Sequence, residues 1–248
     1  MTVIKSPQEV AIMRRAGKIV AAVLQRLREE IKPGIKTSQL DSMAASELKK
    51  YGARASFKGY RGFPASLCVS VNDEVVHGIP GERRLKDGDL VSLDFGAIVD
   101  GFHGDGAITV GVGEISPKAQ ELLAVTEAAL MGGISAARNG AHLGEISSSI
   151  QNYVEKRGFS VVREYSGHGV GRDLHEDPLV PNFGSPDEGS ILQRGMTLAI
   201  EPMVTAGDWR TRVADNRWTV LTADGSLAAH FEHTIAISEG EAEVLTLI

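Results

Sequence analysis

Apolar residues recur at three- and four-residue spacing in the first thirty positions, which is the pattern of an amphipathic helix. They are Val10, Ile12, Met13, Ala16, Ile19, Val20, Val23 and Leu24. Ser6-Pro7-Gln8-Glu9 precedes them. It predicts the start of the helix, because serine caps the first turn, proline suits the first helical position and glutamate completes a capping box. Lys32-Pro33-Gly34 predicts its end.

Three further helices are predicted by the same signals. Residues 38–50 form the second, which Tyr51-Gly52 ends. Ser116-Pro117-Lys118 begins a third, and Arg138-Asn139-Gly140 interrupts it. A fourth then runs to Arg157-Gly158. The later part of the chain thus repeats the order of the earlier part.

Short extended runs follow each helix pair, and they repeat more closely than the helices. Leu85–Asp94 (LKDGDLVSLD) aligns with Leu192–Glu201 (LQRGMTLAIE): each has a glycine turn, an apolar run and a final carboxylate. Upstream, His77-Gly-Ile-Pro matches His175-Glu-Asp-Pro. A spacing of roughly 100 residues is too long for a solenoid. We therefore predict one α+β domain over residues 1–248, built from similar halves of about 1–112 and 113–248.

The composition narrows the class of protein. The 248 residues are 42% hydrophobic and 23% charged, as in ordinary soluble domains. The net charge of −6 argues against broad phosphate binding, and no sequence-specific nucleic-acid partner is expected. Cys68 is the only cysteine, so a disulfide framework is excluded. The N-terminus has no signal-peptide core and no apolar run is long enough to span a bilayer, so we expect a cytoplasmic protein without a membrane partner.

The segment from Val91 to Asp105 predicts a hairpin that turns near Asp100-Gly101. Asp94 and Asp105 then lie on opposite arms, where paired side chains can point the same way. Two carboxylates that lie so near each other without a counter-ion repel, so a positive charge is expected between them. The alternative is that both are turn or solvent carboxylates.

Three more candidate ligands occur later in the chain. Glycines flank His168 in Ser166–Gly171, and Glu201 and Glu232 each lie in an otherwise apolar run. A buried carboxylate needs a partner, either a metal ion or an arginine, and few arginines lie near these two segments. Four carboxylates carry −4, which two divalent cations balance. An oxygen-rich set with one histidine suits Mn²⁺, Fe²⁺, Co²⁺ or Zn²⁺ in hydrolysis.

Motifs for other chemistries are incomplete. Ser166–Gly171 lacks the G-x-G-x-x-G spacing of dinucleotide sites, and His175-Glu-Asp-Pro has no second histidine in helical register. No G-x-S-x-G occurs, and Cys68 lies in an apolar run that is typical of packing.

Together these motifs resemble the type I methionine aminopeptidases, in their short bacterial form. The resemblance covers essentially the whole chain. It rests on Asn72–Pro80, Asp94, His103-Gly-Asp105, Gly167–Gly171, His175–Pro178, Ile200–Met203 and Phe231–Thr234. It implies the pita-bread fold, with two pseudo-symmetric αβ halves around a mainly antiparallel curved sheet. It also implies that the chain removes the initiator methionine of nascent polypeptides when the second residue is small.

The same resemblance assigns roles to single residues. Asp94 would chelate one metal ion, His168 and Glu201 would complete the other, and Asp105 and Glu232 would bridge both. The substrate's free amine would meet the metals, and a metal-activated water would attack the first carbonyl, with Glu201 as general base. His77 and His175 would contact the substrate, and His175 would stabilise the oxyanion. The alternative is that either histidine is a structural residue.

The resemblance also implies a methionine pocket, formed by Phe57, Tyr60, Phe63, Cys68 and Trp218. Leu174 replaces an aromatic residue common in bacterial members, which predicts a wider pocket. One monovalent cation, transient ribosome association and a monomeric state are further expectations. The alternatives are a proline-specific relative (X-Pro aminopeptidase or prolidase) and a non-catalytic module that binds peptide or ribosome.

Overall fold

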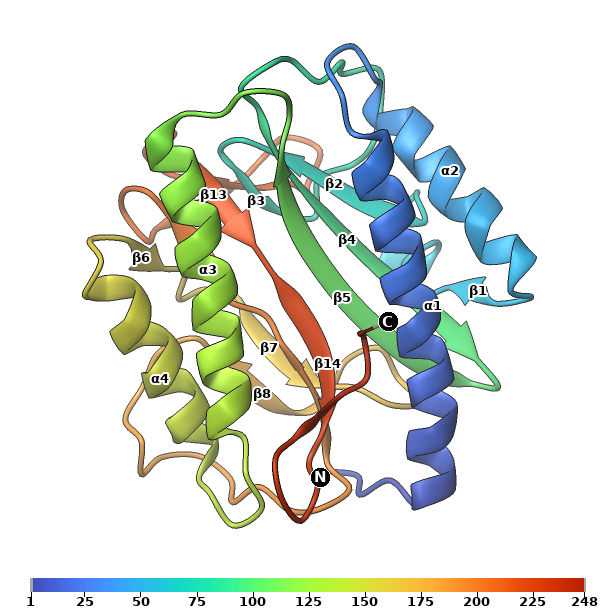
Figure 1. Ribbon diagram of the computed structural model, residues 1–248, viewed down its shortest axis with the longest axis vertical. Helices are drawn as coiled ribbons and strands as arrows, with labels where there is room; N and C mark the ends of the chain where they lie inside the picture. Colours follow the sequence, from blue (N-terminus) through green and yellow to red (C-terminus); the bar gives the residue numbers. More distant parts are fainter. Residues whose placement is uncertain (1, 248) are drawn as a thin grey trace.

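A computed structural model describes residues 2–247 of the chain (Figure 1). Its helices are α1 (Pro7–Glu30), α2 (Thr37–Lys50), α3 (Pro117–Ala136), α4 (Leu143–Glu155) and the short 3₁₀ helix η1 (Tyr60–Gly62). The capping box predicted for α1 is present: Glu9 N–H donates to Ser6 Oγ over 3.3 Å, and Ser6 N–H donates to Glu9 Oε2 over 3.0 Å. At the start of α3, the Ser116 hydroxyl accepts from Ala119 N–H over 3.2 Å, without a reciprocal bond. In the described part of the chain, no helix is long and apolar enough to cross a bilayer.

A nine-stranded sheet is the centre of the molecule. Its strands are β1 (Arg54–Ala55), β2 (Leu67–Val71), β4 (Leu90–Val99), β5 (Phe102–Gly111), β7 (Ser166–Gly169), β8 (Glu176–Pro181), β9 (Thr197–Ile200), β14 (Glu232–Ala236) and β15 (Glu243–Val244). The main path is β1-β4-β5-β14-β9-β7-β8, with β2 beside β4 and β15 beside β14. Each neighbouring pair is antiparallel.

Two three-stranded sheets complete the fold. One has the order β13 (Ala228–His230), β10 (Met203–Thr205) and β6 (Ser160–Val161). The other has the order β11 (Thr211–Val213), β12 (Val220–Thr222) and β3 (Glu74–Val76). The second of these sheets joins β3, from the first half of the chain, to β11 and β12, from the second half.

The four helices lie over one face of the large sheet. α1 lies beside β4 and β5 and α2 beside β2, whereas α3 lies beside β13 and β14 and α4 beside β8 (Figure 1). Two apolar clusters fill the space beneath them. One joins α1 and α2 to β2 and β4, and the other joins α3 and α4 to β9 and β14.

Glycines in β5 allow α1 to lie directly on the sheet. A Cβ atom at Gly104 would lie 2.7 Å from the backbone nitrogen of Gly17, and one at Gly106 would lie 3.2 Å from Val20 Cγ1. Both glycines therefore face the helix. Because side chains alternate between the faces of a strand, Asp105 points to the opposite face. The face away from the helices is thus the one on which polar chemistry can gather.

The two halves of the chain make equivalent contacts. Gly34 N–H donates to Leu85 O over 2.7 Å, and Gly140 N–H donates to Leu192 O over 2.8 Å. Each of these bonds connects the turn between two helices with the turn before a strand that leads to a carboxylate. This agreement supports the proposal of an internal duplication within one domain, with halves of about 1–112 and 113–248 that share the large sheet.

Candidate metal centre

A cavity of about 640 Å³, counted with its mouth, opens where Asp105 points. Its lining residues are Phe57, Tyr60, Arg61, Phe63, Cys68, His77, Asp94, Asp105, His168, Leu174, His175, Glu201, Trp218 and Glu232. All of the predicted metal ligands, both predicted substrate-contacting histidines and every residue of the predicted methionine pocket are among them. The structure therefore brings the whole predicted site to one place, although its members are spread over 176 residues (57 to 232).

The β4–β5 hairpin positions the two aspartates. It turns at Asp100 and Gly101, both with positive φ, as the sequence predicted. Asp94 lies opposite Ala107, and Asp105 lies opposite Gly96. The carboxylates are therefore diagonal neighbours on one face rather than directly opposed, and an ion bound between them could bridge that separation.

His168 comes from β7, and the glycines on either side of it have a packing function. A Cβ atom at Gly167 would lie 2.3 Å from Ala199 O, and one at Gly169 would lie 2.3 Å from Asp177 O. Only glycine lets β7 fit between β8 and β9 at these points. His168 itself faces the cavity, with its Nε2 atom 3.4 Å from Glu201 Oε1 and 4.0 Å from Asp105 Oδ2.

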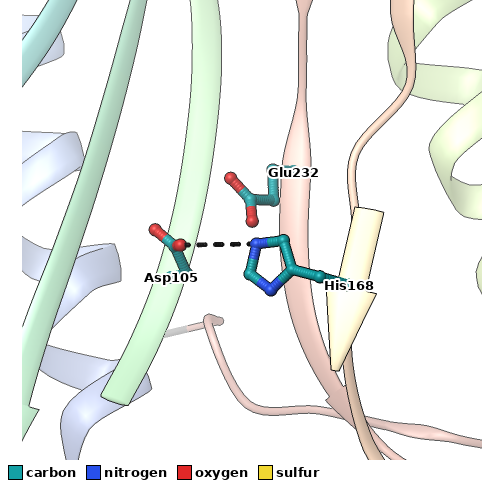
Figure 2. A group of neighbouring side chains, drawn as sticks. All are labelled: Asp105, His168 and Glu232. Carbon is teal, nitrogen blue, oxygen red and sulfur yellow. Dashed lines mark ion pairs between the residues drawn. The ribbon is translucent and has the colours of Figure 1, made fainter. Parts of the chain in front are cut away.

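Glu201 and Glu232 are brought in by adjoining strands. Glu201 directly follows β9, and Glu232 begins β14, which lies between β5 and β9. Thr234 fastens β14 to β5, because its hydroxyl donates to Asp105 O over 2.7 Å and accepts from Asp105 N–H over 2.9 Å. Figure 2 shows the side chains of Asp105, His168 and Glu232 pointing toward one another from three strands. One ligand atom of each lies within 4.8 Å of the others.

The four carboxylates lie close together without a matching cation, Asp105 and Glu232 buried and Asp94 and Glu201 half-buried. Burial raises the pKa of Asp105 to about 7. Burial together with the neighbouring carboxylates raises the pKa values of Asp94, Glu201 and Glu232 well above their usual ranges. Within residues 2–247, their ion pairs are with His168 and His230 only, so the arginine alternative has no support.

The orientation of His168 indicates what this cluster binds. Its Nδ1 atom lies 2.8 Å from Gly169 O, which can only accept, so Nδ1 carries the proton. Burial lowers the pKa of His168 to about 4, so the ring is neutral and Nε2 presents a lone pair to the carboxylates. A lone pair facing carboxylate oxygens is stabilised by a cation between them.

Unpartnered oxygens point to the same conclusion. Asp94 Oδ1 and Glu232 Oε1 are buried without a hydrogen-bond partner. Five donors, four of them carboxylates, form a hard ligand set with a charge of −4. The residues present therefore fit divalent metal ions.

Two histidines stand beside this cluster. His175 Nδ1 lies 2.8 Å from the Tyr60 hydroxyl, and its ring centroid is 4.2 Å from that of His168. Burial, then the neighbouring His168 and Arg61, lower its pKa to about 3. Burial also lowers the pKa of His77 to about 4. Both rings are thus neutral near pH 7 and can exchange hydrogen bonds with a neutral peptide group.

An apolar compartment adjoins the carboxylates. Phe57, Phe63, Ala65, Cys68 and Leu174 form its buried part, with Tyr60, Ile79 and Trp218 packed against them. Cys68 lies opposite Asp94 in the β2–β4 ladder, so the compartment borders the carboxylates directly. Burial, followed by the nearby carboxylates, raises the pKa of the Cys68 thiol well above its usual value. The thiol stays protonated and packs as an apolar group, as the sequence indicated.

Two residues of the site, His230 and Arg61, were not predicted from the sequence. His230 is buried, its Nε2 atom lies 3.6 Å from Glu201 Oε2, and neither ring nitrogen has a hydrogen-bond partner within residues 2–247. Its position two residues before Glu232 was a usable signal, because alternate residues of an extended segment face the same side. Arg61 lines the cavity from η1. No periodic pattern surrounds it, so the sequence contained no comparable signal.

Comparison with known proteins places this geometry in a family. The profile of metallopeptidase family M24 matches residues 11–239. The chain is 54% identical to methionine aminopeptidase 1 of Bacillus subtilis over 248 residues, which is the full length of both. The crystal structure of methionine aminopeptidase from Thermotoga maritima superposes with a TM-score of 0.99 at 48% identity, covering all of both chains.

A more distant neighbour separates fold from family. The prolidase of Pyrococcus furiosus is 24% identical with a TM-score of 0.82, and the match covers 100% of this chain but 66% of that one. It shows the shared fold alone, and the predicted pita-bread fold is confirmed. The chain belongs to metallopeptidase family M24 and, within it, to the methionine aminopeptidases.

Proposed function

We propose that the chain removes the N-terminal methionine of nascent polypeptides whose second residue is small. The observation that carries this proposal is the contact between two compartments of one cavity. Buried carboxylates with raised pKa values border an apolar compartment that contains Cys68. The first can hold metal ions, and the second suits an unbranched thioether.

Five residues would hold two divalent ions. Asp94 would chelate one, His168 and Glu201 would complete the other, and Asp105 and Glu232 would bridge them. Such ions, when bound, lower the pKa of water and polarise a carbonyl group. The family implies metal binding, whereas the number and identity of the ions (Mn²⁺, Fe²⁺, Co²⁺ or Zn²⁺) are part of the proposal, as is one monovalent cation.

Glu201 would act as the general base. Burial, Asp94 and Asp105 raise the pKa of its carboxyl group, so the group accepts a proton more readily than an exposed glutamate. Its Oε1 atom faces His168 Nε2 and its Oε2 atom faces His230 Nε2. The carboxylate is thus held between two rings at the end of β9.

His175 would donate to the oxygen of the first carbonyl group. The ring is neutral near pH 7, and Tyr60 can donate its hydroxyl proton to Nδ1. The ring proton then lies on Nε2, from which it can be donated to developing negative charge on that oxygen. His77, at the other side of the apolar compartment near Trp218, would contact the substrate.

A peptide assay tests the proposal. Cleavage of Met-Ala-Ser is expected, whereas Met-Lys-Ser and Ala-Pro peptides should remain intact, with activity measured in Mn²⁺, Fe²⁺, Co²⁺ and Zn²⁺ in turn. Preferential hydrolysis of X-Pro peptides would support the proline-specific alternative. Failure to cleave any peptide with any metal would favour the non-catalytic module.

A variant pair tests the ligand set. Glu232→Ala should lose bound metal and nearly all turnover, measured by elemental analysis and peptide cleavage. Glu241→Ala removes a carboxylate whose side chain is 87% exposed and should retain both. Full activity of Glu232→Ala would contradict the proposed site.

The proposed setting is the cytoplasm. There the chain would act as a monomer on nascent N-termini, with transient ribosome association. Sedimentation of the purified protein with and without ribosomes measures both the oligomeric state and the association.

A further inference from the structure

The mouth of the cavity is marked by two exposed side chains. Of the side chains that line the cavity, those of Arg61 and His175 are exposed, whereas the rest are buried or half-buried. His175 reaches inward to the carboxylate cluster through His168. Arg61 therefore stands on the solvent side of the group that would bind the carbonyl of the cleaved bond.

The backbone holds Arg61 in a fixed and unusual conformation. It has φ 48° and ψ 23°, in the left-handed region that residues other than glycine rarely adopt. Gly59 and Gly62, on either side, have φ values of 87° and 90°. Gly59 N–H donates to Phe63 O over 2.8 Å and Phe63 N–H donates to Tyr60 O over 2.9 Å, which closes the turn. The loop thus fixes the direction in which the Arg61 side chain leaves the backbone.

The guanidinium group packs on the same ring that orients His175. Arg61 Cζ lies 5.3 Å from the centroid of the Tyr60 ring, and the Tyr60 hydroxyl lies 2.8 Å from His175 Nδ1. Arg61, Tyr60 and His175 therefore form a continuous edge to the cavity mouth.

This cation has no carboxylate partner. Some exposed arginines pair with acids, as Arg15 does with Asp100 and Arg194 with Glu239, whereas Arg61 belongs to those that do not. Within residues 2–247, no ion pair joins Arg61 to any acidic side chain. An unpaired positive charge therefore stands at the opening through which a polypeptide must leave the cavity.

We propose that Arg61 is a specificity determinant that favours an acidic side chain at the third residue of the substrate. This inference rests on the proposed function. With the first side chain in the apolar compartment, an extended substrate advances about 3.3 Å per residue toward the mouth. The second residue must be small, so the third is the first that can bring a charged side chain to Arg61.

Three amidated peptides test the inference: Met-Ala-Glu-Leu-NH₂, Met-Ala-Gln-Leu-NH₂ and Met-Ala-Lys-Leu-NH₂. The amide removes the terminal carboxylate as a competing anion. For the unaltered chain, the glutamate peptide should have a KM about two- to fivefold below that of the glutamine peptide, as for a solvent-exposed ion pair. The lysine peptide should have the highest KM, and 1 M salt should reduce the differences.

Arg61→Ala should bring the KM values of the three peptides together, and Arg61→Glu should invert their order. Arg61→Lys should keep part of the preference, since it keeps the charge on the same turn. Arg138→Ala, which removes an exposed cation in the connection between α3 and α4, outside the cavity lining, should leave the order unchanged. If the glutamine peptide is cleaved and Arg61→Ala does not alter the ratio, the inference is wrong and the proposed function stands. If none of the peptides is cleaved, the proposed function fails and the inference with it.

Discussion

Replacing Asp105 by asparagine should stabilise the metal-free protein while abolishing its activity. The side chain is 4% exposed and its carboxyl group has a pKa of about 7 in the fold, against 3.8 for the unperturbed group. A carboxyl group whose pKa is raised on folding binds more protons in the folded state. The fold therefore loses stability as pH rises from about 4 to about 7.

The magnitude follows from that difference. A shift of 3.2 pH units at 1.36 kcal/mol per unit costs about 4 kcal/mol once pH exceeds 7. At pH 5, only the part of the shift between pH 3.8 and pH 5 contributes, roughly a third of that cost. The stability of metal-free Asp105→Asn relative to the unaltered chain should therefore increase by about 3 kcal/mol between pH 5 and pH 8.

Urea unfolding of chelator-treated protein, followed by circular dichroism at pH 5, 6, 7 and 8, measures this difference. Comparing the two chains at the same pH cancels the contribution of the buried histidines. Asp100→Asn, on the exposed turn of the same hairpin, is the matched control and should change stability by less than about 1 kcal/mol. Saturating divalent metal should reverse the order of Asp105→Asn and the unaltered chain, because the variant lacks one of the proposed ligands. A difference that does not change with pH would refute the reasoning.

Two further predictions concern packing and orientation. Gly167→Ala should lower the free energy of unfolding by several kcal/mol, because its Cβ atom would lie 2.3 Å from Ala199 O. The urea midpoint measures this change. Gly158→Ala, in open space, is the control for general effects of the substitution, although its φ of 77° imposes a smaller cost of its own. Tyr60→Phe should reduce kcat on Met-Ala-Ser about tenfold with little change in KM, because His175 loses the hydrogen-bond partner of its Nδ1 atom. An unchanged kcat would mean that the Tyr60 hydroxyl does not orient the His175 ring.

Much of the local structure was predictable from contiguous residues. The capping signals before α1 and α3 and the turn at Asp100-Gly101 are confirmed. Each of these depends on a few neighbouring side chains and on backbone preferences, which a single sequence states directly. The identity of the carboxylates was also visible, since a charged residue inside an apolar run is costly without a partner.

Other features depended on strand register. The diagonal placement of Asp94 and Asp105 follows from the pairing of β4 with β5, which residue spacing does not determine. The glycines beside His168 allow β7 to pack between β8 and β9, whereas the sequence showed only that they flank the histidine. His230 was overlooked because its significance lies in a contact with Glu201, 29 residues earlier in the chain.

The sequence by itself determined the helices, the hairpin, the repeated order of elements and the five polar residues of the candidate centre. Only the tertiary structure decided which oxygens are left without partners, which nitrogen of His168 faces them and how far burial moves their pKa values. The physical reason is the range of the interactions. Caps and turns form between residues three or four apart, whereas Thr234 fastens β14 to Asp105 across 129 residues. Contacts of that length bring the carboxylates together, and their mutual repulsion is what a bound cation would relieve.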